Sequence, residues 1–232
     1  MTRPLLLGHR GARASRHILE NTLASFELCL QHGCDGFEFD VRRSSDAAAV
    51  ICHDPTHNRL AIATTPAKNL ALPTLAEVLQ QFSSRVFLDI ELKVAGLEQQ
   101  TIAALHEHPP QKGYVVSSFL PEVLTAVHGL DASVPVGLLC EKRNQLPMER
   151  RASHPAGRAG TPVAPSEPSV TWVIPHVDLV DQALVRKFHA SGKKVMGWTV
   201  DRAEKIQQLS EWGVDAIITD ETELIAQIKL LS

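Results

Sequence analysis

The sequence predicts a TIM (β/α)₈ barrel, and three observations carry this prediction. Strand-like and helix-like apolar patterns alternate along almost the whole chain. Eight of the expected strands are each followed by a helix or by a connection of helical length. The chain has 232 residues, a length that one undivided barrel commonly reaches. We therefore expect a single domain over residues 1–232, with functional residues at the carboxyl ends of its strands.

The expected strands are short apolar or alternating segments. In chain order they cover residues 5–7, 36–42, 48–53, 86–93, 114–119, 135–140, 171–175, 194–200 and 216–219. The expected helices carry an apolar stripe with helical period, and they cover about residues 22–32, 75–82, 97–107, 121–130, 181–190, 201–212 and 221–231. Thr74 and Glu77 form a capping box, and Asp201 with Glu204 predicts a second capping pair.

Two segments depart from the regular alternation. Only the turn Ser44-Ser45-Asp46 separates the second strand from residues 48–53, and a parallel crossover needs a dozen residues or more. These two strands should therefore form an antiparallel β-ribbon that rises above the mouth of the barrel and returns His53 to it. Residues 141–169 are rich in Pro, Gly, Ser, Ala and Arg, which predicts a mobile flap, with disorder as the alternative.

Composition excludes several classes of protein. The net charge of -3 and the absence of Lys/Arg runs argue against a nucleic-acid partner. No segment approaches the roughly 18 apolar residues of a membrane span, and the N-terminus leads directly into the first strand, so we expect neither stable membrane insertion nor a signal peptide. The four cysteines follow no metal-binding spacing and predict reduced thiols in a cytoplasmic protein.

Three carboxylates are expected at strand ends around one mouth. Glu38 and Asp40 are two residues apart, so a strand points both side chains the same way, and Glu91 ends another strand. Singly, each is more simply explained as a solvated or ion-paired strand end. Together they would repel by roughly 4 kcal/mol per pair at 4 Å and an effective dielectric near 20. Hard oxygen ligands of this kind predict a Mg²⁺ or Ca²⁺ site.

Cations and proton carriers are expected around the same mouth. Arg10 and Lys93 add positive charge beside the metal, a combination suited to a phosphate group. His9 and His53 approach from different strands. With a phosphodiester, one would take a proton from the attacking oxygen and the other would give one to the leaving alcohol.

Several short motifs together resemble those of the glycerophosphodiester phosphodiesterase family. They occur in the family's order over nearly the full chain: His9-Arg10-Gly11-Ala12, Glu20-Asn21-Thr22, Glu38-Phe39-Asp40-Val41, His53-Asp54, Ile90-Glu91-Leu92-Lys93, Ser117-Ser118-Phe119 and Trp198-Thr199-Val200. The resemblance implies hydrolysis of small glycerophosphodiesters to sn-glycerol 3-phosphate and an alcohol, with a divalent metal.

The resemblance also implies roles for individual residues. Glu38, Asp40 and Glu91 would be metal ligands, and His9 and His53 would be the general base and acid, by attack of the glycerol 2-hydroxyl and a cyclic phosphate intermediate. Arg10 and Lys93 would hold the phosphate, and Glu20 would support the site. We expect the Trp198 side chain either to fill the core or to form a wall against the glycerol carbons. The same two positions are expected for the Phe119 side chain, and the core is favoured for it.

The sequence departs from the family's usual pattern in places. Leu19 precedes Glu20 where proline is usual, Asp201 stands in place of asparagine, and Glu221 in place of proline. Only residues 55–73 separate His53-Asp54 from the next helix, so the cap insertion that many relatives carry is reduced. An open mouth would admit bulkier alcohols or lipids.

Three alternatives follow from these observations. The same barrel could act as a lysophospholipase D-like or a sphingomyelinase D-like enzyme. A non-catalytic binder of phosphate ligands is a third, although it would have no need for two proton carriers. The sequence leaves the choice of metal and the head group open, and it allows a homodimer.

Overall fold

The computed structural model describes residues 3–147 and 169–225, and it confirms the TIM barrel. Eight parallel strands form the barrel: β1 (Leu5–Gly8), β2 (Gly36–Arg43), β6 (Phe87–Leu92), β7 (Tyr114–Ser118), β8 (Val136–Cys140), β9 (Trp172–Pro175), β10 (Lys194–Gly197) and β11 (Ala216–Thr219). Each strand pairs with its neighbours in the order β1-β11-β10-β9-β8-β7-β6-β2. Pairing of Leu7 with Gly36 between β1 and β2 closes the barrel.

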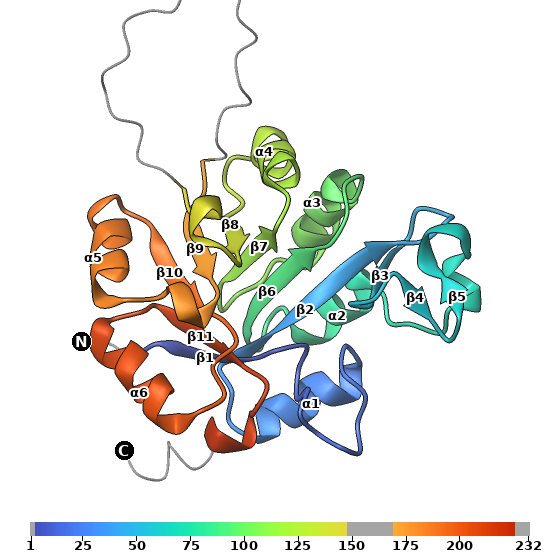
Figure 1. Ribbon diagram of the computed structural model, residues 1–232. Coiled ribbons are helices and arrows are strands. Elements are labelled where there is room, and N and C mark those ends of the chain that lie inside the picture. Colours follow the sequence, from blue (N-terminus) through green and yellow to red (C-terminus); the bar gives the residue numbers. More distant parts are fainter. Residues whose placement is uncertain (1–2, 148–168, 226–232) are drawn as a thin grey trace, which may run out of the picture.

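Helices surround the strands (Figure 1). Among the described residues, the α-helices that lie entirely within the described ranges are α1 (Leu23–Gln31), α2 (Leu75–Phe82), α3 (Glu98–Glu107), α4 (Pro121–Leu130), α5 (Gln182–Ala190) and α6 (Ala203–Trp212). Short 3₁₀ helices cover Ile62–Thr64, Ala67–Asn69, Arg143–Gln145 and Val177–Leu179.

Local sequence signals explain most helix ends. Thr22 caps α1 through the backbone N–H of Ser25, and Thr74 with Glu77 forms the predicted capping box of α2. The predicted capping role of Asp201 is wrong. Arg202 is the N-cap of α6 and has no side-chain cap. Asp201 Oδ1 instead accepts hydrogen bonds from Thr219 Oγ1 and the Asp220 N–H, so this carboxylate fixes the end of β11.

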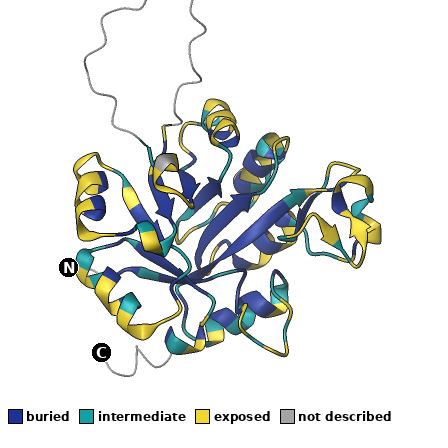
Figure 2. Ribbon diagram, in the orientation of Figure 1, coloured by how far each residue is buried: buried dark blue, intermediate teal, exposed yellow. Residues whose placement is uncertain are grey.

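Two apolar layers lie on either side of the barrel wall, and the strands are almost entirely buried (Figure 2). Outside, Phe26 of α1 stacks on Phe37 of β2 with ring centroids 4.2 Å apart, and Phe82 of α2 meets Phe37 edge-on. Inside, a second cluster includes Leu7, Phe87, Val115, Leu139, Trp172, Ile174, Met196, Ala216 and Ile218. Because side chains alternate along a strand, Glu38 and Asp40 face the inner side while Phe37 and Phe39 face outward.

The antiparallel ribbon is confirmed. β2 continues past the barrel and pairs with β3 (Ala49–Ile51), with Val41 opposite Ile51. Residues 55–73, where the sequence predicts a reduced cap, hold the two-stranded hairpin of β4 (Thr56–His57) and β5 (Leu60–Ala61) with two 3₁₀ helices. Val50, Ile62 and Leu70 form a small buried core beneath it. In Figure 1 this segment lies to one side of the barrel. We refer to residues 44–73 as the ribbon lobe.

Some predicted boundaries differ from the structure. The predicted strand 48–53 is only Ala49–Ile51, and the strand 194–200 ends at Gly197. Most of the predicted flap (148–168) and the end of the predicted last helix (226–231) lie outside the described residues. In the described ranges, no helix is long and apolar enough to cross a membrane. All four cysteines carry free thiols.

The close approach of β2 to β6 at Gly36 gives a testable consequence. A Cβ on Gly36 would lie 1.9 Å from the Phe87 carbonyl oxygen, whereas a Cβ on Gly129 of α4 would meet nothing within 4 Å. We expect Gly36→Ala to lower the free energy of unfolding by about 3 kcal/mol or more, because backbone must move. Gly129→Ala should raise it by about 0.5–1 kcal/mol, as in other helices. Urea unfolding of both variants checks this, and equal stability of Gly36→Ala and the wild type would contradict the strand register.

Candidate active site

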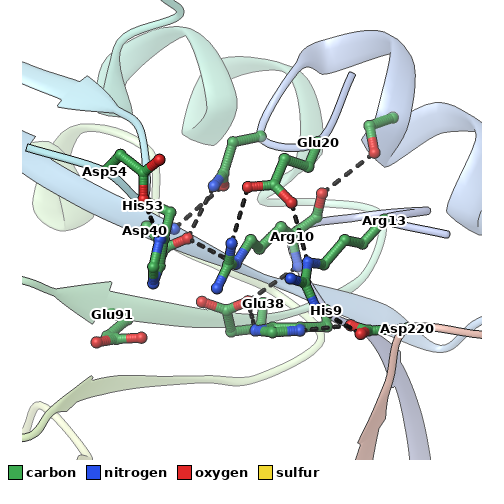
Figure 3. A network of polar contacts seen from close by, with 12 residues as sticks. His9, Arg10, Arg13, Glu20, Glu38, Asp40, His53, Asp54, Glu91 and Asp220 are labelled. Atoms are coloured by element: carbon green, nitrogen blue, oxygen red, sulfur yellow. Dashed lines mark hydrogen bonds and ion pairs between the residues drawn. The ribbon is translucent and has the colours of Figure 1, made fainter. Parts of the chain in front are cut away.

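The turn after β1 organises one side of the candidate site (Figure 3). Arg10 has a φ of 52°, in the left-handed region that few non-glycine residues adopt. This conformation allows its backbone N–H to donate to Glu38 Oε2 at 2.9 Å. Its guanidinium donates to Glu20 Oε1 at 2.8 Å, and its Nε lies 3.3 Å from Asp40 Oδ2. The buried Arg10 therefore connects the loop to two carboxylates of β2.

His9 is held from both sides of its ring. Its Nδ1 lies 2.6 Å from Asp220 Oδ1, and its Nε2 lies 3.8 Å from Glu38 Oε2. Asp220 follows β11 directly and also accepts a hydrogen bond from Arg13. Figure 3 shows His9 between Glu38 and Asp220. These contacts fix the orientation of the imidazole and direct its Nε2 toward the buried carboxylates.

The three predicted carboxylates meet inside the barrel. Asp40 of β2 and Glu91 of β6 are register partners, and Glu38 lies one inward position earlier on β2. One oxygen from each of Glu38, Asp40 and Glu91 lies within 4.8 Å of the others, and all three residues are buried. Lys93 Nζ lies 2.7 Å from Glu91 Oε1 and 3.3 Å from Asp40 Oδ1.

Burial and mutual repulsion shift the acidity of this cluster. Burial, with repulsion from Asp40, raises the pKa of Glu38 well above its ordinary value and that of Glu91 to about 8. Burial also raises the pKa of Asp89, one inward position below Glu91, to about 7. The pKa of Asp40 is lowered, because attraction to Lys93 and Arg10 outweighs its burial. Arg10 and Lys93 therefore neutralise only part of the negative charge of these carboxylates.

This cluster fits a hard divalent cation. Glu38 Oε1 is buried and accepts no hydrogen bond within the described residues, which is costly unless an ion or water completes it. The donor set is all oxygen, the type that Mg²⁺ and Ca²⁺ prefer. An added positive charge would also relieve the repulsion that raises the pKa of Glu38 and Glu91. Glu38, Asp40 and Glu91 therefore form a candidate metal centre.

His53 approaches from the ribbon lobe, as predicted. Its carbonyl oxygen accepts a hydrogen bond from Arg42 Nε at 2.7 Å, and its Nδ1 lies 2.8 Å from Asp54 Oδ1. Burial lowers the pKa of His53 below its ordinary value, against the opposing effect of Asp54. The ring is about one-third exposed.

These groups surround one cavity of about 240 Å³, here called the inner cavity. The lining residues are His9, Arg10, Glu38, His53, Glu91, Lys93, Phe119, Leu139, Glu141, Trp198 and Ile218. Trp198 donates from Nε1 to the Ile174 carbonyl oxygen at 2.9 Å and meets Phe119 edge-on at 5.6 Å between centroids. Both rings thus form an apolar part of the cavity wall, and Lys93 Nζ lies 5.8 Å from the centroid of the Phe119 ring.

The structure brings together almost all of the predicted site residues. Of the ten, Glu20 and Asp40 do not line the inner cavity. Asp40 contacts the lining residues Arg10 and Lys93, and Glu20 bonds to Arg10 and Arg13. Asp220 was missed, although it follows a strand end and so carried the signal used for the other residues. Arg13 was also missed, since nothing in its loop sequence marks it.

The sequence motif that contains Asn21 does not predict the structural contribution of this residue. Its φ is 56°, which asparagine tolerates better than most residues. Its amide Nδ2 donates to Asp40 Oδ2 at 2.8 Å, and its Oδ1 accepts from the Asp40 backbone N–H at 3.2 Å. This two-way contact fixes the carboxylate from behind, leaving Oδ1 toward Lys93.

The chain is similar to known phosphodiesterases over nearly its whole length. Residues 9–99 and 64–224 match the glycerophosphoryl diester phosphodiesterase family. A glycerophosphodiester phosphodiesterase from Caldanaerobacter subterraneus is 27% identical over 97% of both chains. One from Bacillus subtilis is 24% identical over 98% of this chain and 87% of its own length.

Solved structures share the fold. The glycerophosphodiester phosphodiesterase of Thermotoga maritima has a TM-score of 0.78 at 23% identity, covering 98% of this chain and 99% of that one. A phosphodiesterase of Oleispira antarctica, in complex with the product sn-glycerol-3-phosphate, has a TM-score of 0.76 at 26% identity, covering 99% and 98%. On the family match across the barrel, this chain belongs to the glycerophosphoryl diester phosphodiesterase family.

Proposed function

We propose that the protein hydrolyses glycerophosphodiesters to sn-glycerol 3-phosphate and an alcohol. One observation carries the proposal: His9 and His53 line a single cavity beside three buried carboxylates, and the Nδ1 of each lies against an aspartate. Each histidine therefore keeps its Nε2 for a reacting group. The complex of the Oleispira antarctica relative with sn-glycerol-3-phosphate supports the same product here.

In the proposed reaction, the glycerol 2-hydroxyl oxygen attacks phosphorus and gives its proton to one histidine. The bond from phosphorus to the alcohol oxygen breaks, and that oxygen takes a proton from the other histidine. Water then opens the cyclic phosphate, with the two histidines in exchanged roles, to give sn-glycerol 3-phosphate. Arg10 and Lys93 hold the phosphate oxygens, and Phe119 and Trp198 support the glycerol carbons.

Glu38, Asp40 and Glu91 would hold Mg²⁺ or Ca²⁺. When bound, the ion supplies positive charge for the phosphate oxygens. Glu20 acts indirectly by fixing Arg10, and Asp220 acts by fixing His9.

Ion binding should be measurable without an assay of activity. At an ion concentration near 100 times the dissociation constant, we expect Mg²⁺ or Ca²⁺ to raise the Tm of chelated protein by about 5–10 °C. Glu91→Gln should fold without the ion, because it removes excess negative charge, and should lose most of this rise. Glu122→Gln, on the exposed first turn of α4, should keep it. Activity after exhaustive chelation, or an equal Tm rise in all three proteins, would contradict the metal assignment.

Removing either proton carrier should abolish most of the activity. We expect His9→Ala and His53→Ala each to lose about 10²- to 10⁴-fold in kcat with glycerophosphocholine, while His128→Ala on α4 stays near the wild type.

The substrates to compare are glycerophosphocholine, glycerophosphoethanolamine, lysophosphatidylcholine and sphingomyelin. Preferred turnover of either lipid would favour the lysophospholipase D-like or sphingomyelinase D-like alternative. Binding of glycerophosphocholine without any turnover would favour the non-catalytic binder.

The Asp220 contact gives a further test. Asp220→Asn should lower kcat about tenfold or more with little change in KM, because the His9 ring loses its charged partner. The matched control is Asp131→Asn, since Asp131 Oδ2 lies 2.9 Å from His106 Nε2 in a His-Asp pair outside the cavity. A kcat for Asp220→Asn equal to that of the control would show that His9 needs no fixed orientation.

A further inference from the structure

A closed ring of polar contacts joins His9 to Arg10 outside the inner cavity (Figure 3). Asp220 Oδ1 lies 2.6 Å from His9 Nδ1, and Asp220 Oδ2 accepts a hydrogen bond from Arg13 Nη1. Glu20 Oε2 accepts from Arg13 Nε at 3.0 Å, and Glu20 Oε1 accepts from Arg10 Nη1 at 2.8 Å. The peptide bond between His9 and Arg10 closes the circuit. We call these five residues the ionic ring.

Arg13 links two parts of the ionic ring that are remote in sequence. Glu20 lies in the loop after β1, whereas Asp220 follows β11 and is 207 positions from Arg13. Among the residues that the structure describes, Arg13 is the one side chain that forms ion pairs with both carboxylates. It reaches both because two nitrogens of one planar guanidinium donate in different, fixed directions. A lysine ammonium has no such fork.

The ionic ring runs from the protein surface to two buried functional groups. The side chains of Arg13 and Glu20 are 37% and 36% exposed, whereas those of Arg10 and His9 are 10% and 12% exposed. An exposed ion pair contributes little to folding stability, because water screens it. Each carboxylate nevertheless has one oxygen on Arg13 and the other on a residue that lines the inner cavity. Arg13 is not among the lining residues, so its contacts reach the cavity through Glu20 and Asp220.

The two branches of the ionic ring depend on Arg13 to different degrees. Arg10 has a further partner, because its Nε lies 3.3 Å from Asp40 Oδ2. Within the described residues, Asp220 is the side chain that lies within hydrogen-bond distance of the His9 ring. Loss of Arg13 should therefore disturb His9 more than Arg10. Such a loss predicts a fall in kcat with little change in KM.

We propose that Arg13 is a positioning residue of the candidate active site. It holds Asp220 and Glu20 in the orientations that direct His9 and Arg10 into the inner cavity. A proton carrier and a phosphate-binding cation thus share one support at the protein surface. This inference rests on the proposed function.

The first experiment compares Arg13→Met with Arg85→Met. Methionine keeps an unbranched side chain and removes every N–H donor. Arg85 is a matched control, because it forms an ion pair with Glu27 at 2.8 Å in which the side chains are 41% and 39% exposed, and it does not line the inner cavity.

With glycerophosphocholine, we expect Arg13→Met to lower kcat about tenfold and to leave KM within about threefold of the wild type. Arg85→Met should leave both constants unchanged. Each variant should lower the Tm by at most about 4 °C. Arg13→Lys should have an intermediate kcat, because one ammonium can face one of the two carboxylates.

Double-mutant cycles identify the path of the effect. In an Asp220→Ala background, Arg13→Met should lower kcat by less than about twofold, because the support of His9 is already lost. In a Glu20→Ala background it should still cause most of the tenfold loss. A tenfold loss that persists in the Asp220→Ala background, or an equal loss in Arg85→Met, would overturn the inference.

A measurement without activity separates this inference from the proposed function. The NMR signals of the His9 imidazole, assigned with His9→Ala, should shift in Arg13→Met and stay in place in Arg85→Met. Unchanged His9 signals in Arg13→Met would show that Arg13 does not orient this ring, even in an active enzyme. If the wild type turns over no glycerophosphodiester, the proposed function fails, and the His9 signals still decide whether Arg13 positions His9.

Discussion

The concentration of negative charge inside the barrel is the constraint on which the rest of the site depends. The register that pairs Asp40 with Glu91, together with the alternation along β2, brings three carboxylates to within 4.8 Å in a buried place. Burial alone would protonate such groups, and it does raise the pKa of Glu38 and Glu91. Arg10 and Lys93 compensate part of this charge, and the remainder is what makes the cluster suited to a divalent cation.

Loop residues contact and fix the carboxylates that the strands position. Arg10 and Asn21, both at positive φ, contact Asp40 from two sides, and the Arg10 N–H reaches Glu38. The residues with unfavourable backbone conformations are thus those that fix the carboxylate oxygens. Asp220, at the end of the last strand, holds His9 at the start of the first. The parallel pairing of β11 with β1 is therefore also what orients one of the two histidines.

The sequence was sufficient for the barrel, the ribbon and the carboxylate cluster, because each depends on local periodicity or on strand ends. Glu38 and Asp40 could be paired by alternation alone, and the short turn at Ser44 required an antiparallel return of the chain. The Asp201 prediction failed because an aspartate before a helix can bond to any nearby N–H, and here a strand end competes successfully. The contacts of Asn21 with Asp40 and of Arg13 with Asp220 were not predicted, because these partners lie 19 and 207 positions away along the chain and no local pattern reveals them.

The ribbon lobe has a small hydrophobic core of its own, built on Val50, Ile62 and Leu70. The imidazole of His53 is thus carried by a segment that has a small core of its own and is joined to the barrel through the pairing of β3 with β2. Insertions and deletions in residues 55–73 can then accumulate during evolution at low cost to the scaffold. Divergence in these residues would alter the surroundings of His53 and leave the buried carboxylate cluster unaltered.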